Sequence, residues 1–219
     1  MSSLALMRFL ESAPERYDAG MRLITLGRVD RLQDALAEAA ASGPATKVLE
    51  IGCGTGSVTA RLLARGCEVT AIDQNPEMLA QARTRLAGTP PERLVIIEET
   101  ASEIDTLPEG CFDAIVASLS LSEMSADERR YVLKAAVKRL RPGGLLAVAD
   151  EVRPRARWRR TLYAALRAPQ AALGWLLAGT TSHPISDLAA EMAAAGLRIR
   201  GEKRWLLGSL SLVVGERAP

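Results

Sequence analysis

Short apolar stretches recur along the chain between Thr46 and Val152, and helical patterns lie between several of them. The stretches are TKVLEIG, EVTAIDQ, RLVIIEE, FDAIVASLS and LLAVADEV. Each is apolar almost throughout, which is typical of strands that are covered on both faces of a parallel sheet. The helical patterns end at stop signals such as Gly66 and Gly88. This order of elements predicts a doubly wound α/β domain.

The pattern changes towards the end of the chain. ISDLAAEMAAAG predicts a helix, and LRIRGEKRWLLG and SLSLVVGER predict two strands joined by a tight turn at Gly208 and Ser209. A hairpin joined to a parallel sheet makes at least one strand antiparallel. We therefore expect a Rossmann-like, seven-stranded, mostly parallel sheet with an antiparallel C-terminal hairpin strand. Helical patterns in residues 4–41 and 153–183 predict a helical cap over the carboxyl edge of this sheet, where ligands bind in such folds.

The composition is that of a globular protein. The 219 residues are 48% hydrophobic and 25% charged, which is enough apolar material for one domain with a sizeable core. A formal net charge of only +2 argues against a nucleic-acid partner. The first residues lack the apolar core of a signal peptide, and no uninterrupted apolar run of about 18 residues predicts a membrane span. These features favour a cytoplasmic protein.

The cysteines give no sign of a metal site. Cys53, Cys67 and Cys111 show no CxxC spacing, and no histidine lies at metal-ligand spacing from them. We expect reduced thiols and no bound metal.

A glycine-rich turn joins the first strand to the following helix in VLEIGCGTGSVTARLLARG. Gly52, Gly54 and Gly56 allow a ligand to approach the backbone closely, although a tight turn alone would also explain them. A nicotinamide or flavin fingerprint, GxGxxG, would need a third glycine at position 57, which is Ser57. A dinucleotide is therefore disfavoured.

The order E-x-G-x-G-x-G, followed by Asp73 at the end of the second strand, resembles motif I of class I S-adenosylmethionine-dependent methyltransferases. ETASEIDTLPEGCFD and LRPGGLLAVAD resemble later segments of the same family, so that the resemblance covers residues 44–152. PERYDAGMRLITLGR is similar to the entry segment of the ubiquinone/menaquinone-biosynthesis C-methyltransferase branch. SLSLSEMS and GTTSHPI are similar, more distantly, to methyltransferases encoded beside corrinoid-binding proteins.

The resemblance implies S-adenosyl-L-methionine as cofactor and assigns residues to each part of it. The methionine side would be lined by Glu50, Gly52, Cys53, Gly54 and Gly56. The ribose would be bound by Asp73, with Gln74 and Met78 beside it. The adenine would be flanked by Thr100, Ala101 and Ser102. Ser118 would approach the sulfonium, and Tyr17 either closes over the cofactor or only packs its helix. Many relatives carry Asp or Asn where this chain has Thr100, whose hydroxyl group can still bond the adenine amino group.

Two titratable residues are candidates for a catalytic base, should the acceptor need to lose a proton. Glu123 follows the fourth strand, although it would also serve as a capping or surface residue before the helix at Ala126. His183 is the one histidine of the chain and lies beside a proline turn, where a structural role is equally natural. Quinone methyltransferases that resemble this chain tend to carry Arg-Asn at Ser122-Glu123, which argues against a quinone substrate.

The insertion after the fifth strand carries a basic cluster between Arg153 and Arg160, with Trp158 within it. Its arginines are Arg153, Arg155, Arg157, Arg159 and Arg160. A lid with this composition would contact an anionic membrane surface or an acidic protein and admit a lipophilic substrate. A solvated arginine face is the plain alternative.

These observations divide a single methyltransferase domain into four parts. They are an N-terminal helical cap (1–43), a cofactor-binding core (44–152), a lid insertion (153–183) and a C-terminal helix and hairpin (184–219). The predicted function is transfer of a methyl group to a small or lipophilic acceptor. The alternatives are a nicotinamide-dependent oxidoreductase and a non-catalytic, cofactor-binding partner subunit.

Overall fold

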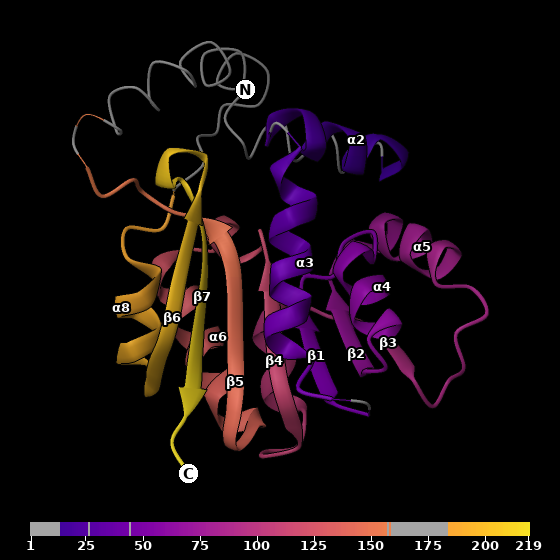
Figure 1. Cartoon of the computed structure of the whole chain (residues 1–219). Helices are drawn as coiled ribbons and strands as arrows, with labels where there is room; N and C mark the ends of the chain where they lie inside the picture. Colours follow the sequence, from indigo (N-terminus) through magenta and orange to yellow (C-terminus); the bar gives the residue numbers. More distant parts are fainter. Residues whose placement is uncertain (1–13, 26, 44, 157, 159–183) are drawn as a thin grey trace.

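A computed structural model describes residues 14–25, 27–43, 45–156, 158 and 184–219. Seven strands form one sheet in the order β3-β2-β1-β4-β5-β7-β6, which runs from right to left in Figure 1. The strands are β1 (Lys47–Ile51), β2 (Glu68–Asp73), β3 (Leu94–Glu98), β4 (Phe112–Ser118), β5 (Leu140–Glu151), β6 (Leu197–Trp205) and β7 (Leu210–Arg217). Strands β1 to β5 are parallel, and β7 is antiparallel to both β5 and β6. The predicted fold is confirmed.

Helices cover both faces of the sheet. The α-helices are α2 (Pro14–Ile24), α3 (Arg28–Ala40), α4 (Ser57–Ala64), α5 (Pro76–Arg85), α6 (Ala126–Arg139) and α8 (Leu188–Ala194). Three short 3₁₀ helices are η1 (Ala101–Thr106), η2 (Leu121–Glu123) and η3 (Leu206–Gly208). In Figure 1, α3 crosses in front of the sheet and α2 lies across its upper edge, where the parallel strand β5 ends.

The alternation of side chains along β1 separates two hydrophobic cores. Val48 packs in the core that contains residues of α3 and α4, whereas Leu49 and Ile51 pack with residues of α6 and α8. Because Glu50 lies two residues after Val48, its side chain points towards α4, where Thr59 Oγ1 donates a hydrogen bond to it at 2.5 Å. The strand thus carries a carboxyl group into an otherwise apolar layer.

Two boundaries differ from the sequence prediction. The strand predicted from LLAVADEV begins earlier than expected: β5 extends back through the Pro-Gly-Gly segment to Leu140, which pairs with Phe112 ahead of a register shift in the β4–β5 ladder. The turn between β6 and β7 spans residues 206–209, so it includes the predicted Gly208-Ser209 and begins two residues earlier. Its 3₁₀ turn is made by Leu206 and Leu207 at φ 49° and 59°, a left-handed conformation that glycine, rather than leucine, signals in a sequence.

Much of the predicted cap lies outside the described residues, namely residues 1–13 and most of the 153–183 insertion. The four-part division of the domain therefore stays a prediction. In the part of the chain that the structure describes, no helix is both long and apolar enough to cross a membrane.

Candidate functional site

A cavity of about 710 Å³ opens at the carboxyl ends of β1, β2 and β4. This volume falls in the range of about 300–1,000 Å³ that is typical of small-molecule sites. Its position is the one expected for a doubly wound sheet, since loops that follow adjacent strands diverge there. Nine of the predicted site residues line it: Tyr17, Gly52, Gly54, Asp73, Gln74, Met78, Ala101, Ser118 and Glu123.

Two glycines of the turn after β1 are needed for different reasons. A Cβ on Gly52 would lie 2.6 Å from Ser120 Cβ, so a larger residue would force the β1 and β4 loops apart. Gly54 has no atom within 4 Å of its Cβ position, which faces open space at the cavity. Both have positive φ, at 72° and 52°. The turn therefore packs tightly on one side and presents bare backbone on the other.

Gly56 and Ser57 begin α4 and lie away from the larger cavity. A Cβ on Gly56 would meet Ala82 and Leu86 of the α5 segment at 3.1–3.4 Å. Ser57, where a dinucleotide fingerprint needs glycine, donates a hydrogen bond to Gln33 Oε1 at 2.9 Å and accepts one from Arg61. The Ser57 contacts join α4 to α3, and Gly56 packs closely against the α5 segment. Gly56 therefore serves helix packing, and its predicted cofactor contact stays a prediction.

Asp73 ends β2 and holds the glycine turn. Its Oδ2 accepts a hydrogen bond from Gly54 N at 2.7 Å, and its Oδ1 accepts one from Asn75 N at 2.9 Å. Asn75, not Asp73, caps α5, because its Oδ1 accepts from the backbone of Glu77 and Met78. A carboxylate has about four acceptor positions, so Asp73 keeps two for a diol in the cavity.

Glu50 and Cys53 line a smaller cavity of about 40 Å³ that adjoins the turn. The Glu50 side chain is fully buried, and burial raises the pKa of its carboxyl group to about 8, helped by the nearby charge of Asp73 and opposed by the Thr59 hydrogen bond. Burial likewise raises the pKa of the Cys53 thiol. At neutral pH, Glu50 is therefore largely protonated and Cys53 is an unreactive thiol.

One of the three residues that were predicted to flank the adenine lines the cavity. Ala101 lines the cavity. Thr100 does not: its backbone N and its Oγ1 both donate to Glu103 Oε2, at 3.0 and 3.1 Å, which organises the start of η1. Ser102 follows within η1 and is not among the lining residues. The roles of Thr100 and Ser102 stay predictions.

Ser118 ends β4 and lines both cavities. Its Oγ is buried and has no hydrogen-bond partner among the described residues. Buried hydroxyl groups are usually hydrogen-bonded, so an orphan at a cavity wall points to a polar atom supplied by a ligand.

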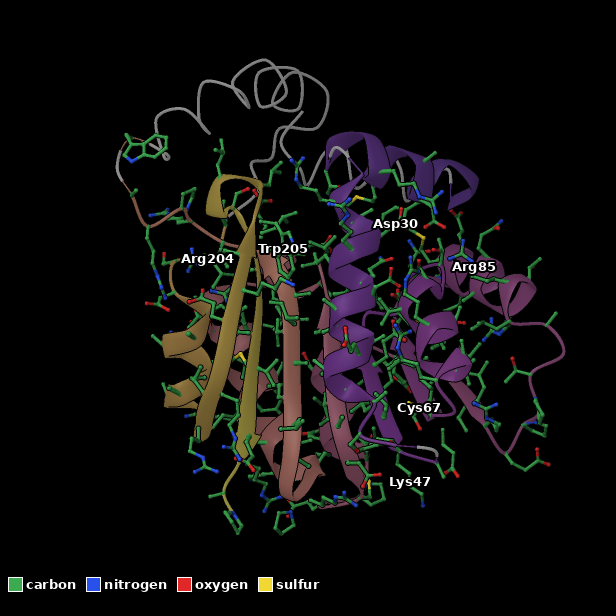
Figure 2. The ribbon with its side chains drawn as sticks, in the orientation of Figure 1. Asp30, Lys47, Cys67, Arg85, Arg204 and Trp205 are labelled. Carbon is green, nitrogen blue, oxygen red and sulfur yellow. The ribbon has the colours of Figure 1, made fainter. Side chains whose placement is uncertain are left out.

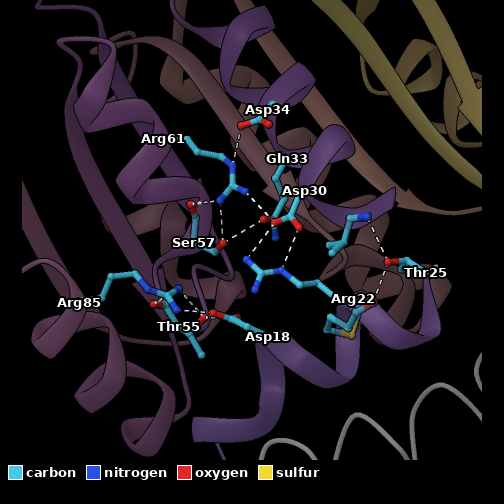
Figure 3. A network of polar contacts seen from close by, with 12 residues as sticks. Asp18, Arg22, Thr25, Asp30, Gln33, Asp34, Thr55, Ser57, Arg61 and Arg85 are labelled. Atoms are coloured by element: carbon cyan, nitrogen blue, oxygen red, sulfur yellow. Dashed lines mark hydrogen bonds and ion pairs between the residues drawn. The ribbon is translucent and has the colours of Figure 1, made fainter. Parts of the chain in front are cut away.

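A polar network attaches the N-terminal helices to the glycine turn (Figure 3). Asp18 on α2 forms an ion pair with Arg85 of α5 and accepts a hydrogen bond from Thr55 Oγ1 at 2.8 Å. Arg61 of α4 forms ion pairs with Asp30 and Asp34 of α3 at 2.9 and 2.8 Å. This network holds α2, and with it Tyr17, at the cavity wall. The sequence carries no recognisable signal for it, since its members come from five separate segments.

A second set of buried polar groups supports the loop after β4. Asp150 on β5 is fully buried, and its Oδ2 accepts from Leu121 N at 2.8 Å and Ser122 N at 3.1 Å. Arg129 donates to the carbonyls of Leu121 and Met124 and pairs with Glu191 at 2.6 Å. Burial raises the pKa of the Asp150 carboxyl group to about 6, against these hydrogen bonds. These hydrogen bonds from Asp150 and Arg129 hold the backbone of the loop that carries Glu123.

The structure describes one of the two predicted catalytic bases. Glu123 is exposed at the end of η2 and lines the cavity. His183 lies outside the described residues, as do Arg157, Arg159 and Arg160. An acid at the carboxyl end of a strand was the signal for Asp73; Asp150 has the same position on β5, but this position does not reveal the loop that Asp150 supports.

The cysteines do not converge on the cavity. Cys53 belongs to the turn, whereas Cys67 lies at the opposite end of the sheet, near Lys47 (Figure 2). All three are free thiols. Among the described residues, no cluster of His, Cys, Asp or Glu has the arrangement of a metal site.

Sequence comparison finds one matching family model, described as a methyltransferase domain, over residues 48–144. An uncharacterized methyltransferase of Mycobacterium tuberculosis is 36% identical over 135 residues, which are 60% of this chain and 66% of the relative. A demethylmenaquinone methyltransferase of Parafrankia is 31% identical over 167 residues, or 70% of this chain and 65% of the relative. The chain thus spans less than two thirds of the length of these curated relatives.

Structural comparison finds the same fold in solved proteins. A 1,6-didemethyltoxoflavin N1-methyltransferase of Burkholderia thailandensis, solved with bound 1,6-didemethyltoxoflavin and S-adenosylhomocysteine, has a TM-score of 0.68 at 20% identity; 99% of this chain and 89% of that one are covered. The [4+2]-cyclase SpnF has a TM-score of 0.69 at 19% identity, with 86% and 81% covered. At these identities the likeness shows the fold alone.

Proposed function

We propose that the protein transfers a methyl group from S-adenosylmethionine to a small acceptor, from the premise that residues 48–144 match the family model of a methyltransferase domain. One observation carries the proposal: the Asp73 carboxylate stands at the cavity wall beside the bare backbone of Gly54. This pairing suits a ribose diol next to a ligand chain that runs along the turn.

The residues present fit this cofactor. Asp73 would accept both ribose hydroxyl hydrogens, and Gln74 and Met78 would border the sugar. Ala101 would contact the adenine edge at the start of η1. The methionine portion would lie over Gly52 and Gly54 towards Glu50 and Cys53. The orphan Ser118 Oγ would donate its hydrogen bond to a polar atom between cofactor and acceptor.

When bound, S-adenosylmethionine supplies an electrophilic methyl group on a sulfonium. The chain's own task is to align an acceptor atom with that methyl group and to keep water away, since a displacement of this kind depends mainly on orientation. Tyr17 on α2 and Leu119 after β4 supply apolar wall for this purpose. Glu123 would take a proton if the acceptor atom carries one.

Calorimetry on dialysed protein separates this function from the alternatives. We expect S-adenosylhomocysteine to bind, and NAD or NADH to leave no measurable heat. Ser57, with its contacts to Gln33 and Arg61, supports this expectation because the third dinucleotide glycine is absent. Binding of NAD(H) alone would contradict the proposal. Tight binding of S-adenosylhomocysteine without turnover of any acceptor in a metabolite extract would favour the non-catalytic partner subunit.

A glycine pair tests the placement of the cofactor. We expect Gly54→Ala to weaken binding of S-adenosylhomocysteine at least tenfold, because the added methyl group enters the space over the turn. Gly110→Ala is the matched control: Gly110 also has positive φ, 66° against 52°, and open space at its Cβ position, but it lies outside the cavity. Both variants should lose roughly 1 kcal/mol of stability. Equal affinities measured by calorimetry would rule out the placement.

The surface after β5 suits a lipophilic acceptor delivered from an anionic membrane or an acidic protein. Trp158 is 61% exposed, and Arg155 is held by Glu202 at 2.7 Å. This part of the proposal is tested by co-sedimentation with vesicles of phosphatidylglycerol and phosphatidylcholine. We expect Trp158→Ala to reduce sedimentation with the anionic vesicles by about half or more, since an exposed indole is a membrane-interface anchor.

A further inference from the structure

The loop after β4 is the part of the cavity wall that the proposed cofactor contacts do not use. In the sheet, β1, β2 and β3, whose following loops carry those contacts, lie on one side of β4, and β5 lies on the other. Residues 119–124, which we name the acceptor-side loop, contribute Leu119, Ser120, Glu123 and Met124 to the lining. An acceptor beside the methyl group would therefore rest against this loop.

The acceptor-side loop begins with a backbone conformation that needs support from its surroundings. Leu119 has a φ of 56°, in the left-handed region that leucine rarely adopts. Its N–H donates to Ala149 O of β5 at 2.8 Å, and Ser120 Oγ donates to Ile51 O of β1 at 3.1 Å. Strained residues persist only where neighbouring structure holds them, and they gather at functional sites. The start of the loop is therefore held by its neighbours and not by its own sequence.

Three charged side chains from separate elements hold the rest of the acceptor-side loop. Asp150 of β5 accepts hydrogen bonds from two successive N–H groups of the loop, at 2.8 and 3.1 Å. Arg129 of α6 donates to two of its carbonyl groups, at 3.4 and 3.1 Å. The other nitrogen atoms of Arg129 donate to the two carboxylate oxygens of Glu191 on α8, at 2.6 and 3.0 Å. We name these three side chains the charged support.

The charged support fixes geometry at a cost in stability. Asp150 is fully buried, and the Arg129 side chain is 7% exposed. Removing charges from water is costly, and apolar side chains of similar volume often stabilise a fold as well or better. What charge-assisted, bidentate hydrogen bonds add is a defined direction. The charged support is therefore better suited to placing the loop than to stabilising the fold.

From this geometry we infer that Asp150, Arg129 and Glu191 are positioning residues, which hold the acceptor-side loop as a preformed wall and so align the acceptor with the methyl group. The inference rests on the proposed methyltransferase function. None of the three is among the described residues that line the cavity, so they act through the loop. Because a displacement of about 1 Å can cost about 100-fold in rate, a loosened loop should slow transfer far more than it weakens cofactor binding.

A second arginine of α6 provides a matched comparison. The Arg139 side chain is also 7% exposed and donates to two backbone carbonyl groups, those of Asp105 and Leu107, with Glu109 at 3.8 Å. The segment that it holds precedes β4 instead of following it, and none of these residues lines the described cavity. Arg139 therefore shares the burial and the bonding pattern of Arg129 but not its place at the site.

The test measures transfer from methyl-labelled S-adenosylmethionine into a metabolite extract, at saturating donor and over serial dilutions of the extract. The dilution series separates the plateau rate, which reports kcat, from the extract concentration at half of the plateau, which reports an apparent KM. Every rate is divided by the concentration of sites that bind S-adenosylhomocysteine in calorimetry. A variant that is partly unfolded is thereby not mistaken for one whose acceptor is misplaced.

Two pairs of variants compare the two arginines. Arg129→Met and Arg139→Met should both lower the melting temperature, because each removes a buried guanidinium from two carbonyl groups. Only Arg129→Met should lower the plateau rate, by about tenfold or more, while the Kd of S-adenosylhomocysteine changes less than about twofold. Glu191→Gln and Glu109→Gln form a milder pair, which decides the question if the methionine variants do not fold. We expect a plateau rate about threefold lower in Glu191→Gln and unchanged in Glu109→Gln.

Asp150→Asn tests the same loop from β5. A single oxygen, Oδ2, accepts both hydrogen bonds from the loop, so an amide oxygen can replace it. The amide NH₂ group would then face Glu151 N, which donates to Oδ1 in the unchanged chain. Asp150→Asn should therefore lose stability but keep most of the plateau rate that Asp150→Ala loses.

The outcomes separate the positioning role from the function on which it rests. Equal plateau rates in Arg129→Met and Arg139→Met, or in the two glutamine variants, would overturn the positioning role and leave the methyltransferase function intact. If the unchanged chain binds S-adenosylhomocysteine but transfers no label, the positioning role is overturned as well, since there is no acceptor to align. If the unchanged chain neither transfers label nor binds S-adenosylhomocysteine, the methyltransferase function itself is overturned.

Discussion

Replacing Asp73 with alanine is expected to weaken binding of S-adenosylhomocysteine by roughly 100-fold or more, because hydrogen bonds to a charged group contribute about 1.5–3 kcal/mol each and two to the ribose are lost. The variant also removes the bonds that Asp73 makes to Gly54 N and Asn75 N. The glycine turn then loses the group that orients it. Isothermal titration calorimetry measures the change.

Asp113→Ala is the control for loss of a structural carboxylate. Asp113 also accepts a backbone hydrogen bond, from Lys47 N at 2.8 Å, and pairs with Arg141 at 2.5 Å. Lys47 lies at the opposite end of the sheet from the polar network around Arg85 (Figure 2). The control should lose comparable stability and keep its affinity. A loss below tenfold in Asp73→Ala would show that the ribose is held elsewhere.

The sheet and the cavity were predictable because both follow from local signals. A buried parallel strand needs a continuous apolar run, and a ligand turn needs glycine where backbone approaches a neighbour or a ligand. Gly52 and Gly54 meet those two needs separately. Asp73 was predictable because a carboxylate at the carboxyl end of a strand in this fold stands at the ligand crevice.

The supports of the site were not predictable, because they depend on contacts between distant segments. Asp150 on β5 holds the backbone of Leu121 and Ser122, 29 and 28 positions away in sequence. Asp18 meets Arg85 across 67 positions. Neither pair leaves a periodic pattern or a motif. Thr100 shows the converse: its hydroxyl was placed at a ligand from the sequence, whereas Glu103, three residues later, receives it in the structure.

The comparisons with known proteins identify the fold of this chain but not its reaction. Proteins of this fold include a methyltransferase and a cyclase at nearly the same TM-score, so the fold does not fix the reaction. The bare backbone of Gly54, the Asp73 carboxylate beside it and the buried Ser118 hydroxyl without a described partner support the proposed cofactor.

The free energy of unfolding is expected to depend strongly on pH, because Glu50 is buried in the folded protein. The pKa of Glu50 is about 8 in the folded protein and about 4.5 in its reference state. The folded state therefore holds one more proton than the unfolded state between these values, and stability falls as pH rises through this window. The slope is about 1.4 kcal/mol per pH unit for one proton. Between pH 6 and 8 we expect a loss of roughly 2–3 kcal/mol in the free energy of unfolding.

The range from pH 6 to 8 separates the titration of Glu50 from that of Asp150. The pKa of Asp150 is about 6, so its own contribution, which has the same sign, is largely lost below the start of the window. Glu50→Gln keeps a neutral group that can accept from Thr59 and should remove most of the slope between pH 6 and 8. Glu38→Gln, at an exposed position of α3, should keep it. Urea unfolding at each pH measures the slope. If the wild-type stability stays level across this range, Glu50 is ionised in the folded protein. Its negative charge at the wall of the smaller cavity would then be balanced within the folded protein.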